Sequence, residues 1–373
     1  MASRILPHPI LLVSGALLAY IGLRLLAPFG AAAQVAGGAF LLVFLFLLPR
    51  SWWIREGVNR WRVLLPWLAI GFFSWLLVLT FARDLVLMAS AVLLAPETYH
   101  ALVRDSALAV MALVPSITLV GFVMARRTAA VREVDVPIEG LHASLEGFTI
   151  AQISDIHVGP TIKGDFLERI VERVNSLSPD MVAITGDLVD GSVADLSPHT
   201  APLGRLASKH GTYFVTGNHE YYSGVHGWVA ELERLGARVL LNEHHVIRHG
   251  DAHVVVAGVT DYSAHHFDPA HRSDAHAAIA GSPRDAVKVL LAHQPRSAIR
   301  ARDAGYDLQL SGHTHGGQFW PWNFFVPLQQ PFTAGLHRLG RMWIYINRGT
   351  GYWGPPKRFG APSEITHLRL VAA

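Results

Sequence analysis

The first third of the chain contains four apolar runs, each close to the ~20 residues that a helix needs to cross the hydrocarbon core of a bilayer. They cover residues 9–26, 31–48, 63–81 and 107–125. Backbone polar groups in lipid must be satisfied within the segment, so runs of this length predict transmembrane helices. Buried in a soluble protein, four runs without a polar face would need a very large core. We therefore expect a transmembrane region over residues 1–128.

A further apolar run at residues 85–94 is too short for a full span. It can extend the third helix, form a re-entrant segment or make a fifth crossing, and we favour four crossings. We expect no cleaved signal peptide, because further apolar runs follow the first.

Arginine side chains gather in two clusters that four crossings would place on the same side of the membrane. Cytoplasmic loops carry an excess of Lys and Arg, so this bias places the C-terminal domain in the cytoplasm of a multi-pass membrane protein. The arginines are Arg50, Arg55, Arg60 and Arg62 before the third run, and Arg126, Arg127 and Arg132 after the fourth.

From Val134 onward, short β-branched runs alternate with amphipathic stretches, a pattern typical of an α/β layered fold. Phe166, Ile170 and Val174 recur at helical spacing, and further helices are expected at 225–235 and 297–303. The expected strands are 148–153, 181–185, 213–216, 239–241, 253–259, 287–292, 308–310, 342–346 and 365–371.

Polar residues follow five of these strands at the point where each strand ends. In open α/β sheets, ligand sites collect beyond the carboxyl ends of the strands, so we expect these residues to meet. The segments are Ser154-Asp155-Ile156-His157, Gly186-Asp187, Gly217-Asn218-His219-Glu220, His293 and Gly312-His313-Thr314-His315. The glycines among them permit the tight turns and close backbone approach of a crowded site.

These strand ends offer carboxylate, imidazole and amide-oxygen ligands, a mixture that suits Zn, Mn, Fe, Co or Ni. Seven ligands are too many for one such ion and fit two ions that share a bridge. Two adjacent ions can clamp the attacking and leaving oxygens of an in-line phosphoryl displacement by a metal-bound hydroxide. The seven are Asp155, His157, Asp187, Asn218, His293, His313 and His315.

The motifs in this order resemble the calcineurin-like metallophosphoesterase superfamily, and with the membrane helices they resemble its membrane-associated bacterial branch. The resemblance covers about residues 138–371. It implies that the transmembrane helices precede an α/β domain, residues 134–373, of four α/β/β/α layers with two mixed sheets. The motifs are Asp155-x-His157, Gly186-Asp187-x-x-Asp190, Gly217-Asn218-His219-Glu220, His293 and Gly312-His313-x-His315.

The resemblance also implies roles for these residues, with two divalent cations (Mn, Fe, Zn or similar) as cofactors. One ion would be bound by Asp155, His157, Asp187 and His315, and the second by Asp187, Asn218, His293 and His313, with Asp187 as the bridge. His219 would stabilise the phosphoryl group or protonate the leaving oxygen. Asp190 and Glu220 would lie next to the ligands, and Glu220 would help to orient His219.

The pattern departs from two branches of the superfamily. Purple acid phosphatases have a tyrosine where this chain has Asp190, and protein Ser/Thr phosphatases have an arginine where it has Gly191. We therefore expect phosphodiesters or small phosphomonoesters as substrates.

An aromatic segment follows His315, and the prolines within it argue against a regular helix. Two interpretations stay open: a hydrophobic loop that covers the sheet, or an apolar wall for a lipid-like substrate near the bilayer. Arg348 and Arg358 could contact phosphate there, because guanidinium suits bidentate phosphate binding. The aromatic residues are Phe319, Trp320, Trp322, Phe324 and Phe325, followed later by Tyr352 and Trp353.

The sequence thus predicts a membrane-anchored phosphoester hydrolase whose partners are the lipid bilayer and a phosphoester substrate. A catalytically inactive metal-binding sensor or scaffold is a second hypothesis, but neither the ligands nor His219 are missing. A nuclease is a third. The net charge is only +3 and there is no basic stripe with interleaved aromatic residues, so no nucleic-acid partner is expected.

Overall fold

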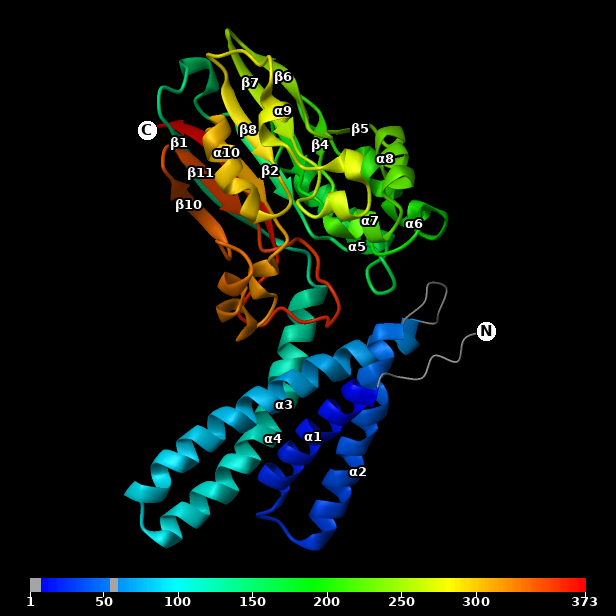
Figure 1. Cartoon of the computed structure of the whole chain (residues 1–373), viewed down its shortest axis with the longest axis vertical. Helices are drawn as coiled ribbons and strands as arrows, with labels where there is room; N and C mark the ends of the chain where they lie inside the picture. Colours follow the sequence, from blue (N-terminus) through cyan, green and yellow to red (C-terminus); the bar gives the residue numbers. More distant parts are fainter. Residues whose placement is uncertain (1–7, 54–59) are drawn as a thin grey trace. The chain divides into compact units, whose positions relative to one another are not determined.

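The computed structural model describes residues 8–53 and 60–373. It separates into two compact units, one made of Met1–Val123 with Gly354–Lys357 and the other of Met124–Trp353 with Arg358–Ala373 (Figure 1).

Four apolar helices run through the first part of the chain. Three of the described helices are long and apolar enough to cross a membrane by length and composition, and the other offers a shorter apolar stretch, Leu11–Leu26. The run at 85–94 extends the third helix. The helices are α1 (His8–Leu26), α2 (Ala31–Leu47), α3 (Arg60–Leu93) and α4 (Pro96–Arg126). The number of crossings and the orientation stay predictions; among the arginines, Arg55 and the side chain of Arg60 lie outside the described residues.

Charged residues inside these apolar helices are paired with one another. The carboxylate of Asp84 in α3 accepts hydrogen bonds from Tyr20 Oη and Arg24 Nε of α1, both at 2.8 Å. The buried Arg83 donates to the Val103 carbonyl of α4 at 2.7 Å. Because an unpaired charge in an apolar surrounding is costly, this network ties α1, α3 and α4 together.

The second unit contains two six-stranded mixed sheets. Strands β2 to β5 pair in parallel in the first sheet, and β7, β8, β9 and β11 do so in the second. In order across the first sheet, the strands are β1 (Ala130–Ile138), β12 (Glu364–Ala372), β2 (Thr149–Ile153), β3 (Met181–Ile184), β4 (Thr212–Phe214) and β5 (Ala237–Val239). Across the second they are β10 (Gly335–Leu339), β11 (Met342–Ile346), β9 (Leu308–Ser311), β8 (Val287–Leu291), β7 (Ala252–Gly258) and β6 (Glu243–His249).

Helices cover the outer face of each sheet, and three apolar cores separate the layers (Figure 1). One core packs α5, α6 and α8 on the first sheet, a second fills the space between the sheets, and a third packs α9 and α10 on the second sheet. The predicted four-layer α/β/β/α architecture is therefore confirmed. The helices are α5 (Gly164–Asn175), α6 (Val193–Thr200), α7 (Asn218–Tyr222), α8 (Val225–Arg234), α9 (Ala275–Ile279) and α10 (Ala298–Ala304).

The strand predictions fail at the edges of the sheets. Strands β1, β6 and β10 were not predicted, and each lies at an edge. The strand predicted at 239–241 was displaced, because β5, also at an edge, ends at Val239. Edge strands carry charged and polar side chains that discourage pairing with other chains, so their apolar signal is weak.

Candidate metal centre

The loops that follow β2, β3, β4, β8 and β9 meet at one edge of the second unit, where the carboxyl ends of both sheets lie together. Gln152 Nε2 of the first sheet donates to the Ser311 carbonyl of the second at 2.9 Å. His293 Nδ1, after β8, lies 2.7 Å from the Thr185 carbonyl after β3. All five predicted strand ends therefore deliver their polar residues to the same place.

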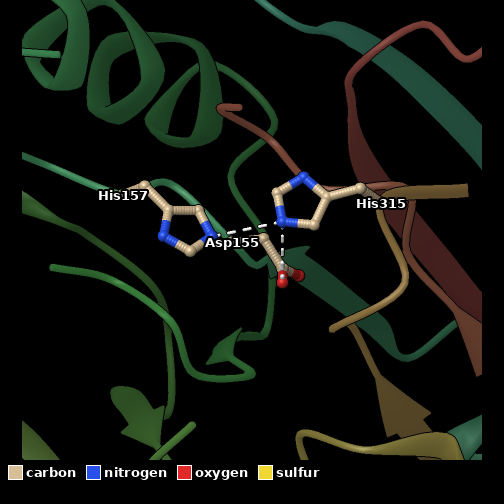
Figure 2. Close-up of side chains that lie close together, drawn as sticks. All are labelled: Asp155, His157 and His315. Carbon is tan, nitrogen blue, oxygen red and sulfur yellow. Dashed lines mark hydrogen bonds and ion pairs between the residues drawn. The ribbon is translucent and has the colours of Figure 1, made fainter. Parts of the chain in front are cut away.

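A first group of donor atoms comes from Asp155, His157 and His315, all buried (Figure 2). The Nε2 atoms of the two histidines face each other at 3.1 Å. His315 Nε2 lies 3.4 Å from Asp155 Oδ1. One donor atom from each residue lies within 4.8 Å of the others.

A second group comes from Asp187, His293 and His313. His293 Nε2 lies 3.1 Å from Asp187 Oδ2 and 3.2 Å from His313 Nδ1. The same Asp187 oxygen is 3.9 Å from His157 Nε2 of the first group. The Asp187 carboxylate thus stands between the two groups, where the predicted bridge requires it.

The two groups fit divalent cations. Buried polar atoms are costly without a partner, yet among the described residues the buried Oδ1 of Asn218 accepts no hydrogen bond. Facing imidazole nitrogens, carboxylate oxygens and an unpaired amide oxygen are the donors that borderline divalent metals use. The residues predicted as ligands can therefore hold metal.

Backbone strain is concentrated at the same residues. In the part of the chain that the structure describes, five of the eight non-glycine residues with positive φ are predicted ligands: Asp155, His157, Asp187, His313 and His315. Such conformations cost of order 1–3 kcal/mol each and persist only where the surroundings enforce them. Here the loops brace one another, since the N–H groups of Asp155 and His157 donate to the carbonyls of Gly186 and Asp187.

Two glycines let these loops approach. A Cβ atom on Gly312 would lie 2.0 Å from Ser154 Oγ and 2.1 Å from Asp155 Oδ2. A Cβ on Gly217 would lie 2.2 Å from Asp187 Oδ1. No side chain fits at either position, as the sequence predicted for this crowded edge.

His219 is oriented by Asp190, and the prediction that Glu220 orients it was wrong. Asp190 Oδ1 lies 2.5 Å from His219 Nδ1 and 3.2 Å from His157 Nδ1. The Glu220 carboxylate instead turns back into the loops and accepts backbone N–H groups of Gly217, Asp187 and Leu188 at 2.6, 3.0 and 2.7 Å. Glu220 thereby satisfies backbone donors at the start of α7 and after β3.

The two carboxylates beside His219 set its charge. Burial would lower the pKa of His219, but the nearby Asp187 and Asp190 outweigh burial and raise that pKa to about 9. His313 behaves in the opposite way: burial, reinforced by His293, lowers its pKa to about 3. At neutral pH His219 is therefore cationic, and His313 is a neutral imidazole that can bind metal.

Arg358 is fully buried behind His315, with its Nη2 3.0 Å from His315 Nδ1, so the expectation that it contacts phosphate was wrong. Its side chain is fully buried and donates to the backbone carbonyls of His315, Arg348 and Gly351. The Arg348 side chain is 28% exposed, and its Nη1 lies 3.3 Å from Glu364 Oε2. Of the two arginines, Arg348 alone retains an exposed part.

The aromatic segment after His315 divides between interior and surface. Phe319 and Tyr352 are buried. Trp353 and Tyr222 flank His219, and their ring centroids lie 5.6 and 5.2 Å from that of the His219 imidazole. The sequence pattern did not predict either neighbour. The remaining aromatic side chains are exposed, so they do not form a buried cover over the sheet. These are Trp320, Trp322, Phe324 and Phe325.

Comparison with known proteins gives a consistent result. The family model for calcineurin-like phosphoesterases matches residues 148–317. "Transmembrane protein with metallophosphoesterase domain" of Bos taurus is 42% identical over 72% of this chain and 62% of its own length. The protein from Danio rerio of the same name is matched over 60% of its length, so this chain spans about three fifths of these two relatives.

An "Uncharacterized metallophosphoesterase" of Aquifex aeolicus is 32% identical over 59% of this chain and 84% of its own length. Among solved structures, the sulfate thiohydrolase SoxB of Thermus thermophilus is similar with a TM-score of 0.37 and 15% identity, covering 60% of this chain and 56% of its own.

Replacing Glu220 by Gln tests its role in holding the loops. Gln keeps one acceptor oxygen but turns an NH₂ group toward a backbone N–H, so we expect a loss of about 1–3 kcal/mol of stability and a lower metal content. Urea unfolding and metal analysis measure both. The exposed Glu172→Gln is the control; equal unfolding midpoints for the two variants would refute this role.

Proposed function

Because this chain belongs to the calcineurin-like phosphoesterase family, we propose that it hydrolyses a phosphodiester or phosphomonoester with two divalent cations. The observation that carries the proposal is the position of Asp187 Oδ2, within 3.1 Å of a histidine from one donor group and 3.9 Å of one from the other.

The proposed ligand sets follow the two donor groups. When bound, the ions would neutralise phosphoryl charge and lower the pKa of an attacking water from about 15.7 toward about 7. Mn, Fe, Zn and similar metals suit these ligands. Asp155, His157, Asp187 and His315 would hold one ion, and Asp187, Asn218, His293 and His313 the other, with Asp187 shared.

His219 would supply the proton for the leaving oxygen. Its Nδ1 is engaged by Asp190, so its Nε2 is the atom that can face a substrate. The Asp190 carboxylate at Nδ1 raises the pKa of His219 and favours the protonated imidazole. A proton donor positioned opposite the attacking water favours displacement in line with the leaving group.

Membrane anchoring, several crossings and a cytoplasmic domain belong to the same proposal. The apolar helices α2, α3 and α4 support the anchoring, as does a relative named as a transmembrane protein. The exposed aromatic side chains at residues 320–325 support a lipid-like substrate, because such a patch is costly in water and favourable against acyl chains. Arg348 would contact the phosphate.

Removal of the shared carboxylate tests the metal dependence. We expect Asp187→Asn to lose bound metal and turnover of an aryl phosphodiester together, as both ion sites depend on this residue. Chelation of the wild-type protein should have the same effect. His265→Ala is the control, since His265 lies outside the donor groups. A metal-free protein with full activity would end the proposal, and a metal-loaded one without turnover on a phosphoester panel would favour the sensor or scaffold.

The role of His219 predicts a dependence on the leaving group. His219→Gln should keep its metal content and lower kcat by about 100- to 10,000-fold for an alkyl leaving group, which needs protonation. A p-nitrophenyl leaving group needs little protonation and should lose much less. Steady-state kinetics on a matched alkyl and aryl pair measure the difference; equal losses for both substrates would contradict the role as proton donor.

The proposed substrate contacts make separate predictions. Arg348→Ala should lower kcat/KM by about 10-fold or more for any phosphoester, because a charge-assisted hydrogen bond is worth about 1.5–3 kcal/mol. Replacing Phe324 and Phe325 by Ser should lower kcat/KM for a lipid phosphoester in mixed micelles but not for a water-soluble analogue. Arg338→Ala, which affects an exposed ion pair with Glu139, is the control. Unchanged lipid turnover in the Ser variant would remove the lipid proposal.

The chain has no cysteine, so single cysteines can report the topology. With four crossings, a membrane-impermeant maleimide applied to intact cells should label Glu97→Cys in the first turn of α4. It should not label Lys209→Cys on the surface of the second unit until the membrane is permeabilised. Labelling of both residues, or of Lys209→Cys alone, in intact cells would refute the proposed orientation.

A further inference from the structure

Two histidines and an aspartate outside the candidate metal centre bring three further donor atoms together. They are His226, the second residue of α8, and Asp268 and His271 in the connection between β7 and β8. One donor atom from each lies within 4.8 Å of the other two. The proposed function uses none of these residues.

Both histidines direct the same ring nitrogen at one carboxylate oxygen. His226 Nε2 lies 3.3 Å from Asp268 Oδ2, and His271 Nε2 lies 3.9 Å from the same atom. The second distance is too long for a hydrogen bond. Asp268 and His271 are three residues apart across the 3-10 helix η5 (Pro269–His271), whose geometry places such residues on one face.

Neighbouring groups engage the other polar atoms of Asp268 and His271. Asp268 Oδ1 accepts the Ala270 N–H at 2.9 Å, which leaves Oδ2 for the histidines. His271 Nδ1 lies 2.8 Å from Tyr221 Oη, which is in turn 3.3 Å from Thr216 Oγ1. If Nδ1–H donates to Tyr221, Nε2 carries the lone pair. A hydrogen bond of this kind on the far nitrogen is how proteins orient metal-bound histidines.

The exposure of the three residues leaves room for a hydrated ion. The side chains of His271 and Asp268 are 14% and 27% exposed, and that of His226 is 75% exposed. Solvent can therefore reach the group, above all at His226. Zinc and related ions bind in this way when a coordination position is kept open for water.

A second group of the same composition, Asp180, His210 and His249, is less suited to a cation. Asp180 Oδ2 already accepts the backbone N–H and the hydroxyl of Thr149. The ammonium group of Lys209 lies 3.9 Å from Asp180 Oδ1 and competes for it.

We propose that His226, Asp268 and His271 bind a borderline divalent cation such as zinc, separate from the candidate metal centre. Two imidazoles and one carboxylate select for such ions over Mg²⁺ and Ca²⁺, which prefer oxygen ligands. The ion joins α8 to the β7–β8 connection. Through Tyr221 it also braces α7, the helix that carries Asn218 and His219.

Metal stoichiometry of the full-length protein in detergent tests the site. In equilibrium dialysis against zinc, wild-type protein should hold one equivalent more than His226→Ala or Asp268→Asn. His265→Ala, whose ring lies 4.0 Å from that of His266, is the matched control and should bind as wild type does. Tyr221→Phe removes no donor atom but should weaken the extra equivalent by about 10- to 100-fold.

This site and the proposed function can fail independently. Asp187→Asn should lose the ions of the candidate metal centre and keep the equivalent that depends on His226. Circular dichroism should show each variant folded, because His226 is exposed and Asp268→Asn keeps an oxygen that can accept the Ala270 N–H. Wild-type zinc stoichiometry and affinity in either His226→Ala or Asp268→Asn would overturn the proposal.

Discussion

The site depends on the position of the Asp187 carboxylate between two donor groups, each of which combines residues from both sheets. One of its oxygens lies 3.1 Å from His293 of the second sheet and 3.9 Å from His157 of the first. Among the described residues, the buried Oδ1 of Asn218 has no hydrogen-bond partner, and burial of such an atom is costly. A cation at the centre would supply that partner, which links metal binding to the stability of the loops.

Two buried side chains of opposite charge, Glu220 and Arg358, hold those loops by forming hydrogen bonds with backbone groups that regular secondary structure leaves unpaired. Glu220 accepts three backbone N–H groups beneath the β3 and β4 loops. Arg358 donates to four backbone carbonyls around the loop that carries His315. Loops that leave regular strands in left-handed conformations have polar groups that no ladder satisfies. A charged side chain with several donors or acceptors can satisfy a group of them at once. Both residues thus support the ligands' backbone instead of touching a substrate.

Polar side chains are also paired in the apolar helices, where the Asp84 carboxylate accepts hydrogen bonds from both Tyr20 and Arg24. Among the described residues, many of the exposed large apolar side chains lie on the candidate membrane helices, and four more lie in the aromatic segment after His315. These two features come from distant parts of the sequence, and each is favourable only beside an apolar phase.

The order of motifs, the strand-end placement of the ligands and the apolar runs could all be derived from the sequence, because side-chain chemistry and periodicity are local properties. Local patterns also identified the central strands, whose two buried faces leave continuous apolar runs. The edge strands β1, β6 and β10 escaped detection since their polar side chains carry no such signal. Tertiary structure alone decided that Asp190 and not Glu220 orients His219, that Arg358 turns inward and that Trp353 stands beside His219. Each of these arrangements involves residues that only the packing of separate loops brings together. In the packed protein, the available hydrogen-bond partners and space determine the direction of each side chain.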